Sequence, residues 1–309
     1  MITTMRALRA TGDAAAPIAF KTVPIPDAGA NDTLVRVYAI SLNAGEVRRA
    51  PGRAAGDPLG WDFAGTVAAG PRSGARVVGL MPDQGAWAEY VAVPDAYVAP
   101  IPAGVAFEDA ATLPVAGLTA LRALRHGAPL AGKHVLISPG TGGAGLFAIQ
   151  LAARAGARVT ASARRADAEA QLRAAGAHDV AIGEPAALRA FAPYDVVLES
   201  LGGDALGVAL TALNPDGIVI HFGQTVSGET TFRSNAFYLT GGARLYGFVL
   251  FHEAEKHPLS ADLGFLAELV GRAELRTHIE TTLDFDDFLA AFARKTGAGR
   301  KGKIVVRLP

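Results

Sequence analysis

A glycine-rich turn between two strongly apolar segments restricts the fold of this chain more than any other feature. Residues 134–138 have the length and composition of a buried strand, and residues 146–155 have those of an apolar helix. The turn between them contains Gly140, Thr141, Gly142, Gly143, Ala144 and Gly145. Glycines at such a turn permit a sharp reversal, let backbone N–H groups approach a phosphate and let the helix pack closely on the strand. The pattern predicts a dinucleotide-binding turn, although a purely structural turn also uses glycine.

The segments around this turn alternate between expected helices and expected strands. Helical spacing covers residues 115–125 and 167–175. Further short strands are expected at residues 158–161, 179–182, 196–199 and 218–222. Alternation at this spacing is typical of parallel βαβ units in a doubly wound sheet.

The first hundred residues have a different pattern. Short strands rich in Val and Tyr are separated by clusters of Gly, Pro and Asp, and no long helix lies between them, which indicates a β-rich module. After about residue 248 the pattern is mixed, with helices expected at 263–270 and 285–293 and a final strand at 303–308. We therefore expect an α/β chain that combines a β-rich module with a doubly wound parallel sheet.

Composition excludes several classes of protein. The chain has 29 Lys and Arg against 29 Asp and Glu, so it lacks the basic excess typical of nucleic-acid binding. It has no cysteine, which excludes disulfides, thiolate catalysis and cysteine-ligated metals. No apolar run reaches the roughly 18 residues of a membrane span, and the N-terminus does not resemble a signal peptide. We expect a cytoplasmic protein that acts on a small molecule, with no nucleic-acid or membrane partner.

The end of the second strand of the βαβ unit bears on the choice of coenzyme. Sites for NAD place an Asp or Glu there to bind the ribose hydroxyl groups. Here Ser162 is followed by Arg164 and Arg165, and the acid is missing. These three residues would hold a 2′-phosphate through charge-assisted hydrogen bonds, so the sequence favours NADPH. The alternative is that both arginines only face solvent at the start of a helix.

Several short motifs, in their order along the chain, resemble one enzyme family. They lie at residues 41–43, 60–67, 85–91, 113–121, 134–151 and 302–306. Together they resemble the medium-chain dehydrogenase/reductase superfamily, in its zinc-free quinone oxidoreductase and enoyl reductase branch. The resemblance covers nearly the whole chain, and it is more specific for the superfamily than for the substrate.

The resemblance implies two domains and a dimer. Residues 1–116 and 249–309 would form a GroES-like catalytic domain, and residues 117–248 would form an inserted Rossmann domain, with the cofactor in the cleft between them. It also implies a homodimer that pairs strands near residues 244–250. The alternative for that segment is an ordinary edge strand.

The resemblance also implies that no metal takes part. Zinc members of the superfamily have a Gly-His-Glu motif and a cysteine ligand, whereas this chain has Gly60, Trp61 and Asp62 and no cysteine. Trp61 cannot ligate a metal. Without a Lewis acid, the resemblance favours hydride transfer to an acceptor that is already activated, such as a quinone, an enone or an enoyl thioester.

Further site residues are carried over from the family. Asn43 matches an asparagine near the nicotinamide, with turn capping as the alternative, and Thr119 matches a threonine there, with helix packing as the alternative. The other positions expected at the cofactor are Gly223, Phe248 and Val249. We expect Asn43, Trp61, Asp62 and Tyr90 to be the catalytic candidates. Asp62 or Tyr90 would donate a proton, unless solvent supplies it.

One segment departs from the family pattern. Quinone oxidoreductases commonly have an Asp and a Tyr at residues 45–52, where this chain has Glu46, Arg48 and Arg49. Glu46 and Arg49, with Trp61 and Asp62, would shape a pocket for a polar acceptor, or Glu46 and Arg49 would form an exposed ion pair. Three functions stay open: a quinone or enone reductase, an enoyl reductase acting in trans in secondary metabolism, and a cofactor-binding protein with a non-redox role.

Overall fold

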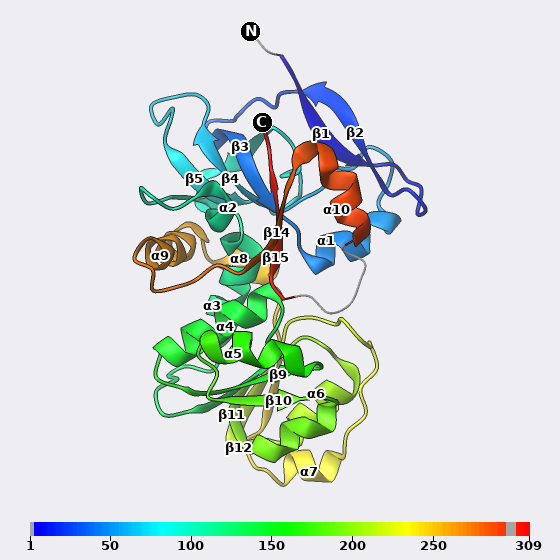
Figure 1. Ribbon diagram of the computed structural model, residues 1–309, viewed down its shortest axis with the longest axis vertical. Helices are drawn as coiled ribbons and strands as arrows, with labels where there is room; N and C mark the ends of the chain where they lie inside the picture. Colours follow the sequence, from blue (N-terminus) through cyan, green and yellow to red (C-terminus); the bar gives the residue numbers. More distant parts are fainter. Residues whose placement is uncertain (1–2, 295–300) are drawn as a thin grey trace. The chain divides into compact units, whose positions relative to one another are not determined.

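The computed structural model describes residues 3–294 and 301–309. Contacts within the chain divide it into two compact units, one formed by Met1–Leu118 and Phe251–Pro309 and the other by Thr119–Leu250. Each unit has its own β-sheet (Figure 1). The α/β class expected from the sequence, with a mainly antiparallel module and a separate parallel sheet, is confirmed.

The first unit is built around a seven-stranded sheet with the order β14-β15-β3-β4-β5-β7, in which β6 also pairs with β3 (Figure 1). Its strands are β3 (Asp32–Ser41), β4 (Asp62–Val67), β5 (Arg76–Leu80), β6 (Tyr90–Pro94), β7 (Val98–Pro100), β14 (Ile279–Asp284) and β15 (Lys303–Arg307), and a separate hairpin consists of β1 (Thr4–Ala10) and β2 (Ile18–Pro24). Its helices are α1 (Ala44–Arg49), α2 (Phe107–Ala110), α8 (Leu250–Lys256), α9 (Ser260–Gly271) and α10 (Phe288–Arg294). The strand nearest the C-terminus thus pairs with β3, near the start of the chain.

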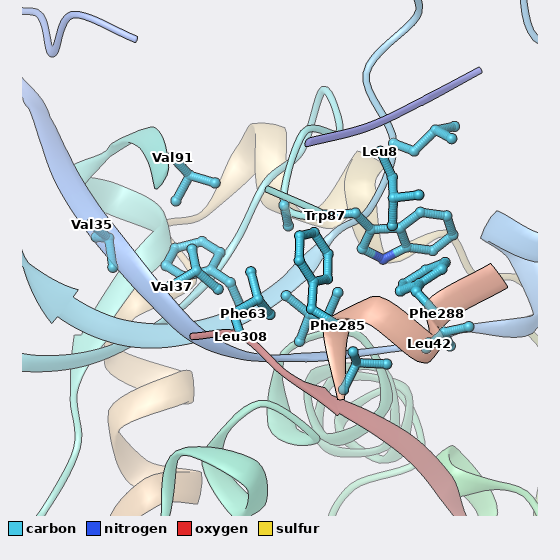
Figure 2. Packing of buried hydrophobic residues seen from close by; sticks show 14 of the residues in the cluster. Leu8, Val35, Val37, Leu42, Phe63, Trp87, Val91, Phe285, Phe288 and Leu308 are labelled. Atoms are coloured by element: carbon cyan, nitrogen blue, oxygen red, sulfur yellow. The ribbon is translucent and has the colours of Figure 1, made fainter. Parts of the chain in front are cut away.

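The core of the first unit lies between the sheet and the helix α10. Alternate residues of β3, such as Val35 and Val37, point into it, as the period of two along a strand requires. Trp87 is fully buried against Phe288, with ring centroids 4.7 Å apart (Figure 2). Gly60 passes so close to Trp87 that an added Cβ would lie 2.2 Å from the indole. Packing around Trp87 therefore fixes the backbone just before the candidate residues 61 and 62.

The second unit holds a six-stranded parallel sheet with the order β10-β9-β8-β11-β12-β13. The strands are β8 (His134–Ser138), β9 (Arg158–Ala163), β10 (Asp179–Ile182), β11 (Tyr194–Glu199), β12 (Leu213–His221) and β13 (Arg244–Gly247). The helices are α3 (Leu118–Arg125), α4 (Gly143–Arg154), α5 (Glu169–Ala174), α6 (Gly203–Leu210) and α7 (Ser234–Tyr238). The strand order reverses between β8 and β11, which is where open α/β sheets bind ligands at their carboxyl edge.

Some expected helices are shorter than the sequence pattern predicts. The segment expected as one helix at 115–125 begins with a π-helical turn at Leu113–Gly117, and α3 follows it. Pro114 lies in that turn and has no N–H to donate. Similarly, the helix expected at 167–175 consists of a 3₁₀ turn at Ala166–Ala168 followed by α5. Within the described ranges, the structure has no helix whose length and apolar character suit a membrane crossing.

Candidate functional site

The glycine turn connects β8 to α4 at the carboxyl edge of the parallel sheet. Gly142 is the residue before the helix, and a Cβ added there would meet nothing within 4 Å, so the backbone at this position is open. Gly145 lies in the first helical turn, where an added Cβ would be 2.3 Å from the carbonyl oxygen of Pro139. Two roles expected for these glycines, an open backbone and close packing of helix on loop, thus fall on different residues.

Three polar residues lie at the end of β9, beside this turn. The buried Ser162 hydroxyl donates a hydrogen bond to the Ser138 hydroxyl at 3.0 Å. Arg165 forms an ion pair with Asp167 at 3.0 Å. Arg164 is exposed and makes no hydrogen bond or ion pair with any residue that the structure describes. Arg164 is therefore the guanidinium that a phosphate could bind here without breaking an existing ion pair.

A pair formed by a buried carboxylate and a partly exposed imidazole lies at the carboxyl ends of the next two strands, β11 and β12. Glu199 is fully buried and accepts hydrogen bonds from the backbone N–H groups of Leu201, at 2.6 Å, and Gly202, at 3.1 Å. His221 Nδ1 lies 2.8 Å from its second oxygen. In the strand register, Glu199 lies between Ser138 and His221. Sequence reasoning missed this pair, although each residue ends a predicted parallel strand.

The remaining cofactor candidates in the second unit are Thr119, Phe248, Val249 and Gly223. Thr119 is buried at the start of α3. Phe248 is buried directly after β13, and its N–H donates to the carbonyl of His221 at 2.8 Å. Val249 has 57% of its surface exposed. Gly223 approaches Ser200 so closely that an added Cβ would be 3.0 Å from its Cβ.

A second cluster, in the first unit, surrounds Asp62. Ser41 and Asp62 are opposite each other on β3 and β4, and β15 lies on the other side of β3. The fully buried Asp62 carboxylate accepts hydrogen bonds from the Ser41 hydroxyl at 2.6 Å and from Asn43 Nδ2 at 2.8 Å. It also accepts from the backbone N–H of Val115 at 2.9 Å and from Lys303 Nζ at 3.2 Å. Every one of these four neighbours is a donor, so Asp62 serves as an acceptor.

Lys303 is the residue of this cluster to which sequence analysis gave no role. It has 4% of its surface exposed, and its ammonium group donates to the Asn43 side-chain oxygen as well as to Asp62. Its position in the sequence, 260 residues after Asn43, hides this contact. Its place in the motif at residues 302–306 was the available indication.

Trp61 and Glu46 have structural contacts of their own. The Trp61 indole is buried against Phe251, with ring centroids 4.8 Å apart, and a Cβ added to Gly45 would lie 3.2 Å from it. Glu46 is also buried and accepts the backbone N–H groups of Asn43 and Trp61, each at 2.6 Å. The interpretation of Glu46 as part of an exposed ion pair is therefore wrong. Arg49 is exposed, with its guanidinium 5.8 Å from the centre of the Trp61 ring.

Tyr90 lies apart from the other catalytic candidates. It starts β6, opposite Arg36 of β3, and packs against the small cluster of Met5, Ala7 and Ala88. Asn43 lies seven residues beyond Arg36, which is roughly 20 Å along an extended strand. The structure thus brings Asn43 and Asp62 together and does not bring Tyr90 to them.

Comparison with known proteins identifies the family. A family model described as zinc-binding dehydrogenase matches residues 175–306. Prostaglandin reductase-3 of Bos taurus is 31% identical over 330 residues, with 93% of this chain and 84% of that protein covered. The chain belongs to the medium-chain dehydrogenase/reductase family. This confirms the resemblance found in the sequence motifs.

Two further matches extend the comparison. The quinone oxidoreductase of Coxiella burnetii superposes with a TM-score of 0.85 at 28% identity, with 99% of this chain and 100% of that chain covered. The Spectinabilin polyketide synthase system protein NorB of Streptomyces orinoci is 32% identical over 304 residues. That match covers 93% of this chain but 14% of NorB, so the chain spans about a seventh of that relative. Medium-chain dehydrogenases/reductases are oxidoreductases that use nicotinamide cofactors.

The residues of this family member do not fit the zinc ion in the description of its family model. Trp61, whose indole cannot bind a metal, stands in the Gly-Trp-Asp stretch, and the chain has no cysteine. Among the residues that the structure describes, no three His, Asp or Glu side chains are grouped so that they could hold a metal ion. We therefore derive no chemical step through zinc.

Gly142 and Gly145, at the start of α4, give a test of the glycine turn. We expect Gly145→Ala to lower the free energy of unfolding by about 1–3 kcal/mol, because the new methyl group would overlap the Pro139 carbonyl. Gly142→Ala is the matched control, with an expected change below about 1 kcal/mol, because nothing occupies the space around its Cβ. Urea unfolding of both variants measures the difference. Equal effects would contradict the packing role of Gly145.

Proposed function

We propose that the protein is an NADPH-dependent oxidoreductase that transfers a hydride, without zinc, to a quinone or to an alkene conjugated to a carbonyl. The observation that carries the proposal is the composition of the Asp62 cluster. Where zinc relatives have a metal ligand, Trp61 is packed into the core, and beside it a buried amide, that of Asn43, is held by Lys303 and Asp62. Such a site offers a hydrogen-bond donor to an acceptor that is already electron-poor.

The second unit has the features that a phosphorylated dinucleotide requires. Gly142 exposes backbone at the start of α4, where the helix dipole favours the pyrophosphate. Arg164, with Ser162, would hold the 2′-phosphate, and the absence of an acid at the end of β9 disfavours NADH. The other residues of this unit proposed at the cofactor are Thr119, Gly140, Thr141, Gly143, Ala144, Gly145, Arg165, Gly223, Phe248 and Val249. Asn43, a further candidate, belongs to the first unit. When bound, NADPH supplies the hydride.

Negative charge develops on the acceptor oxygen as the electron-poor carbon is reduced, and hydrogen-bond donors stabilise that charge. Asn43 has one Nδ2 hydrogen that is not used by Asp62, and this hydrogen is the proposed donor. Asp62 already accepts four hydrogen bonds. Tyr90 pairs with Arg36 of β3, away from Asn43. We therefore assign the final proton to solvent.

The relatives support this reaction class and leave a second enzyme in view. The names quinone oxidoreductase and prostaglandin reductase-3 agree with reduction of quinones and enones. The match to a seventh of NorB, a polyketide synthase protein, favours as a second candidate an enoyl reductase that acts in trans on acyl thioesters. A protein that binds NADPH without turnover is the third, non-enzymatic candidate.

We also propose that the protein is a homodimer that pairs through β13. This strand is the last of the parallel sheet, so one of its edges is open. Leu245 on β13 has 51% of its surface exposed, and Tyr238 and Leu239 just before it are 68% and 71% exposed. An open edge with apolar side chains is the arrangement that a second strand can cover.

Substrate panels separate the three candidates. We expect the purified protein to oxidise NADPH, followed by absorbance, in the presence of simple quinones or enones. A preference for enoyl thioesters over free quinones would select the enoyl reductase. NADPH binding without turnover of any of these acceptors would contradict a reductase and select the binding protein.

Coenzyme choice depends on Arg164 in this proposal. Loss of a charge-assisted hydrogen bond costs about 1.5–3 kcal/mol, so Arg164→Ala should raise the KM for NADPH roughly 10- to 150-fold and leave NADH use little changed. Arg165→Ala is the matched control and should have a smaller effect, because Arg165 is already paired with Asp167. An unchanged NADPH KM in Arg164→Ala would remove the argument for a 2′-phosphate.

Dimerisation is tested by placing a charge on the open edge. We expect Leu245→Lys to weaken self-association at least about tenfold, because the ammonium group would be buried by the pairing strand. Leu289→Lys, at an exposed leucine of α10, is the matched control. Sedimentation velocity over a range of protein concentrations measures both. A wild-type protein that stays monomeric would refute the dimer.

A further inference from the structure

The Asn43 carboxamide is held by two groups of opposite hydrogen-bonding character. Its oxygen accepts from the Lys303 ammonium group, and its nitrogen donates to the Asp62 carboxylate. A lysine ammonium can only donate, and a carboxylate that already accepts from three other groups can only accept. Turning the amide by 180° would place N–H groups against the ammonium and the oxygen against the carboxylate. The amide therefore has a single allowed orientation.

The backbone of Asn43 is fixed as firmly as its side chain. Its N–H donates to the buried Glu46 carboxylate at 2.6 Å, at the start of the short helix α1. The residue follows β3 by two positions, and β3 is paired on both sides. Main chain and side chain are thus held by separate carboxylates. In the capping box that starts α1, the Asn43 side chain also accepts from the backbone N–H of Glu46. A change at Lys303 removes the ammonium donor from the amide while both contacts to Glu46 remain.

We propose that Lys303 is a positioning residue that orients the Asn43 amide so that its unused N–H is presented to the acceptor. This inference rests on the proposed function, and it limits the kind of chemical group that can contact Asn43. The group that meets Asn43 must accept a hydrogen bond, as the carbonyl oxygen of an enone, thioester or quinone does. A ligand that meets Asn43 through a donor group alone does not match this orientation.

A purely structural ion pair between β15 and β4 is the competing explanation for Lys303. Buried ion pairs contribute little net stability, because both charges lose their hydration, and apolar replacements often serve as well. Here the ammonium group contacts Asn43 in addition to Asp62. If the role is structural, loss of Lys303 will disturb the main chain and the amide of Asn43 together. If Lys303 positions the amide, the amide will respond alone.

Selective labelling makes the two responses visible. The chain contains only four asparagines, Asn31, Asn43, Asn214 and Asn235, so ¹⁵N-asparagine gives four backbone N–H signals and four pairs of side-chain NH₂ signals. Asn43→Asp assigns the pair of Asn43. In Lys303→Met we expect the Asn43 side-chain amide to exchange with solvent at least about tenfold faster, while its backbone N–H, bonded to Glu46, keeps its protection. Joint loss of both, or no change in either, would overturn the positioning role.

Further variants keep the test decisive if the methionine variant does not fold. Lys303→Gln leaves a donor for Asp62 but replaces the ammonium group at the Asn43 oxygen by a neutral amide that can also accept, so only Asp62 still opposes a turn of the Asn43 amide. We expect faster side-chain exchange here too. Lys303→Arg remains a donor-only cation and should preserve slow exchange. Lys301→Met removes a charge two residues away and should leave the Asn43 signals unchanged. Slow exchange in Lys303→Gln would overturn the proposal.

Steady-state kinetics tests whether the oriented N–H of Asn43 contributes to reduction of the acceptor. With the best enone or quinone, we expect Lys303→Gln to lower kcat at least about tenfold with little change in the KM for NADPH, and Lys303→Arg to recover most of that loss. An unchanged kcat in Lys303→Gln would overturn the proposal while the reductase function stands. If the wild-type protein reduces no acceptor, the proposed function and the acceptor assignment fall together, and the exchange measurements still decide whether Lys303 orients Asn43.

Discussion

A carboxylate with no solvent contact needs donors from the protein, and Asp62 obtains them from four separate segments. Its partners come from β3, from the second residue after β3, from the turn at residue 115 and from β15. Removing a single partner from a buried ion pair costs about 3–5 kcal/mol, because the remaining charge is left unpaired. Asp62 therefore ties the final strand to the centre of the first unit and fixes the position of Asn43.

The second unit meets a different constraint at the glycine turn after β8. This turn must leave backbone accessible to a ligand and must also let α4 pack closely on it. Parallel strands place Ser162, Ser138, Glu199 and His221 at one edge of the sheet. Gly145 lets α4 lie directly on the loop after β8, and Gly142 keeps the first turn of that helix accessible. A residue with a side chain at position 145 cannot give the close packing, because the nearest backbone oxygen already lies 2.3 Å from the missing Cβ.

Local patterns were sufficient to predict the fold class, the glycine turn and the family, because each depends on residues close together in the sequence. The Asn43–Lys303 contact could not be predicted in this way, since it depends on which strand closes the antiparallel sheet. One of the two alternatives for Glu46, an exposed ion pair with Arg49, was wrong for a related reason. A glutamate beside arginines resembles a surface ion pair, and only the position of Trp61 shows that its carboxylate is buried under two backbone N–H groups. Tyr90 was chosen by residue type, and pairing of β6 with the far end of β3 separates it from Asn43.

The Lys303 ammonium group and the Asn43 amide suggest how a member of this family could reduce an acceptor without a metal. A Lewis acid stabilises charge on an oxygen through a full positive charge placed next to it. Here the full charge, on Lys303, is buried behind Asn43, and it polarises the amide whose oxygen it binds. On the proposed function, the acceptor then meets an N–H dipole that needs no reorganisation as charge develops, which is the condition for electrostatic stabilisation in a buried site. Replacing the ion by an oriented amide lowers the charge that the acceptor meets, so the reaction must begin with an acceptor that is already electron-poor.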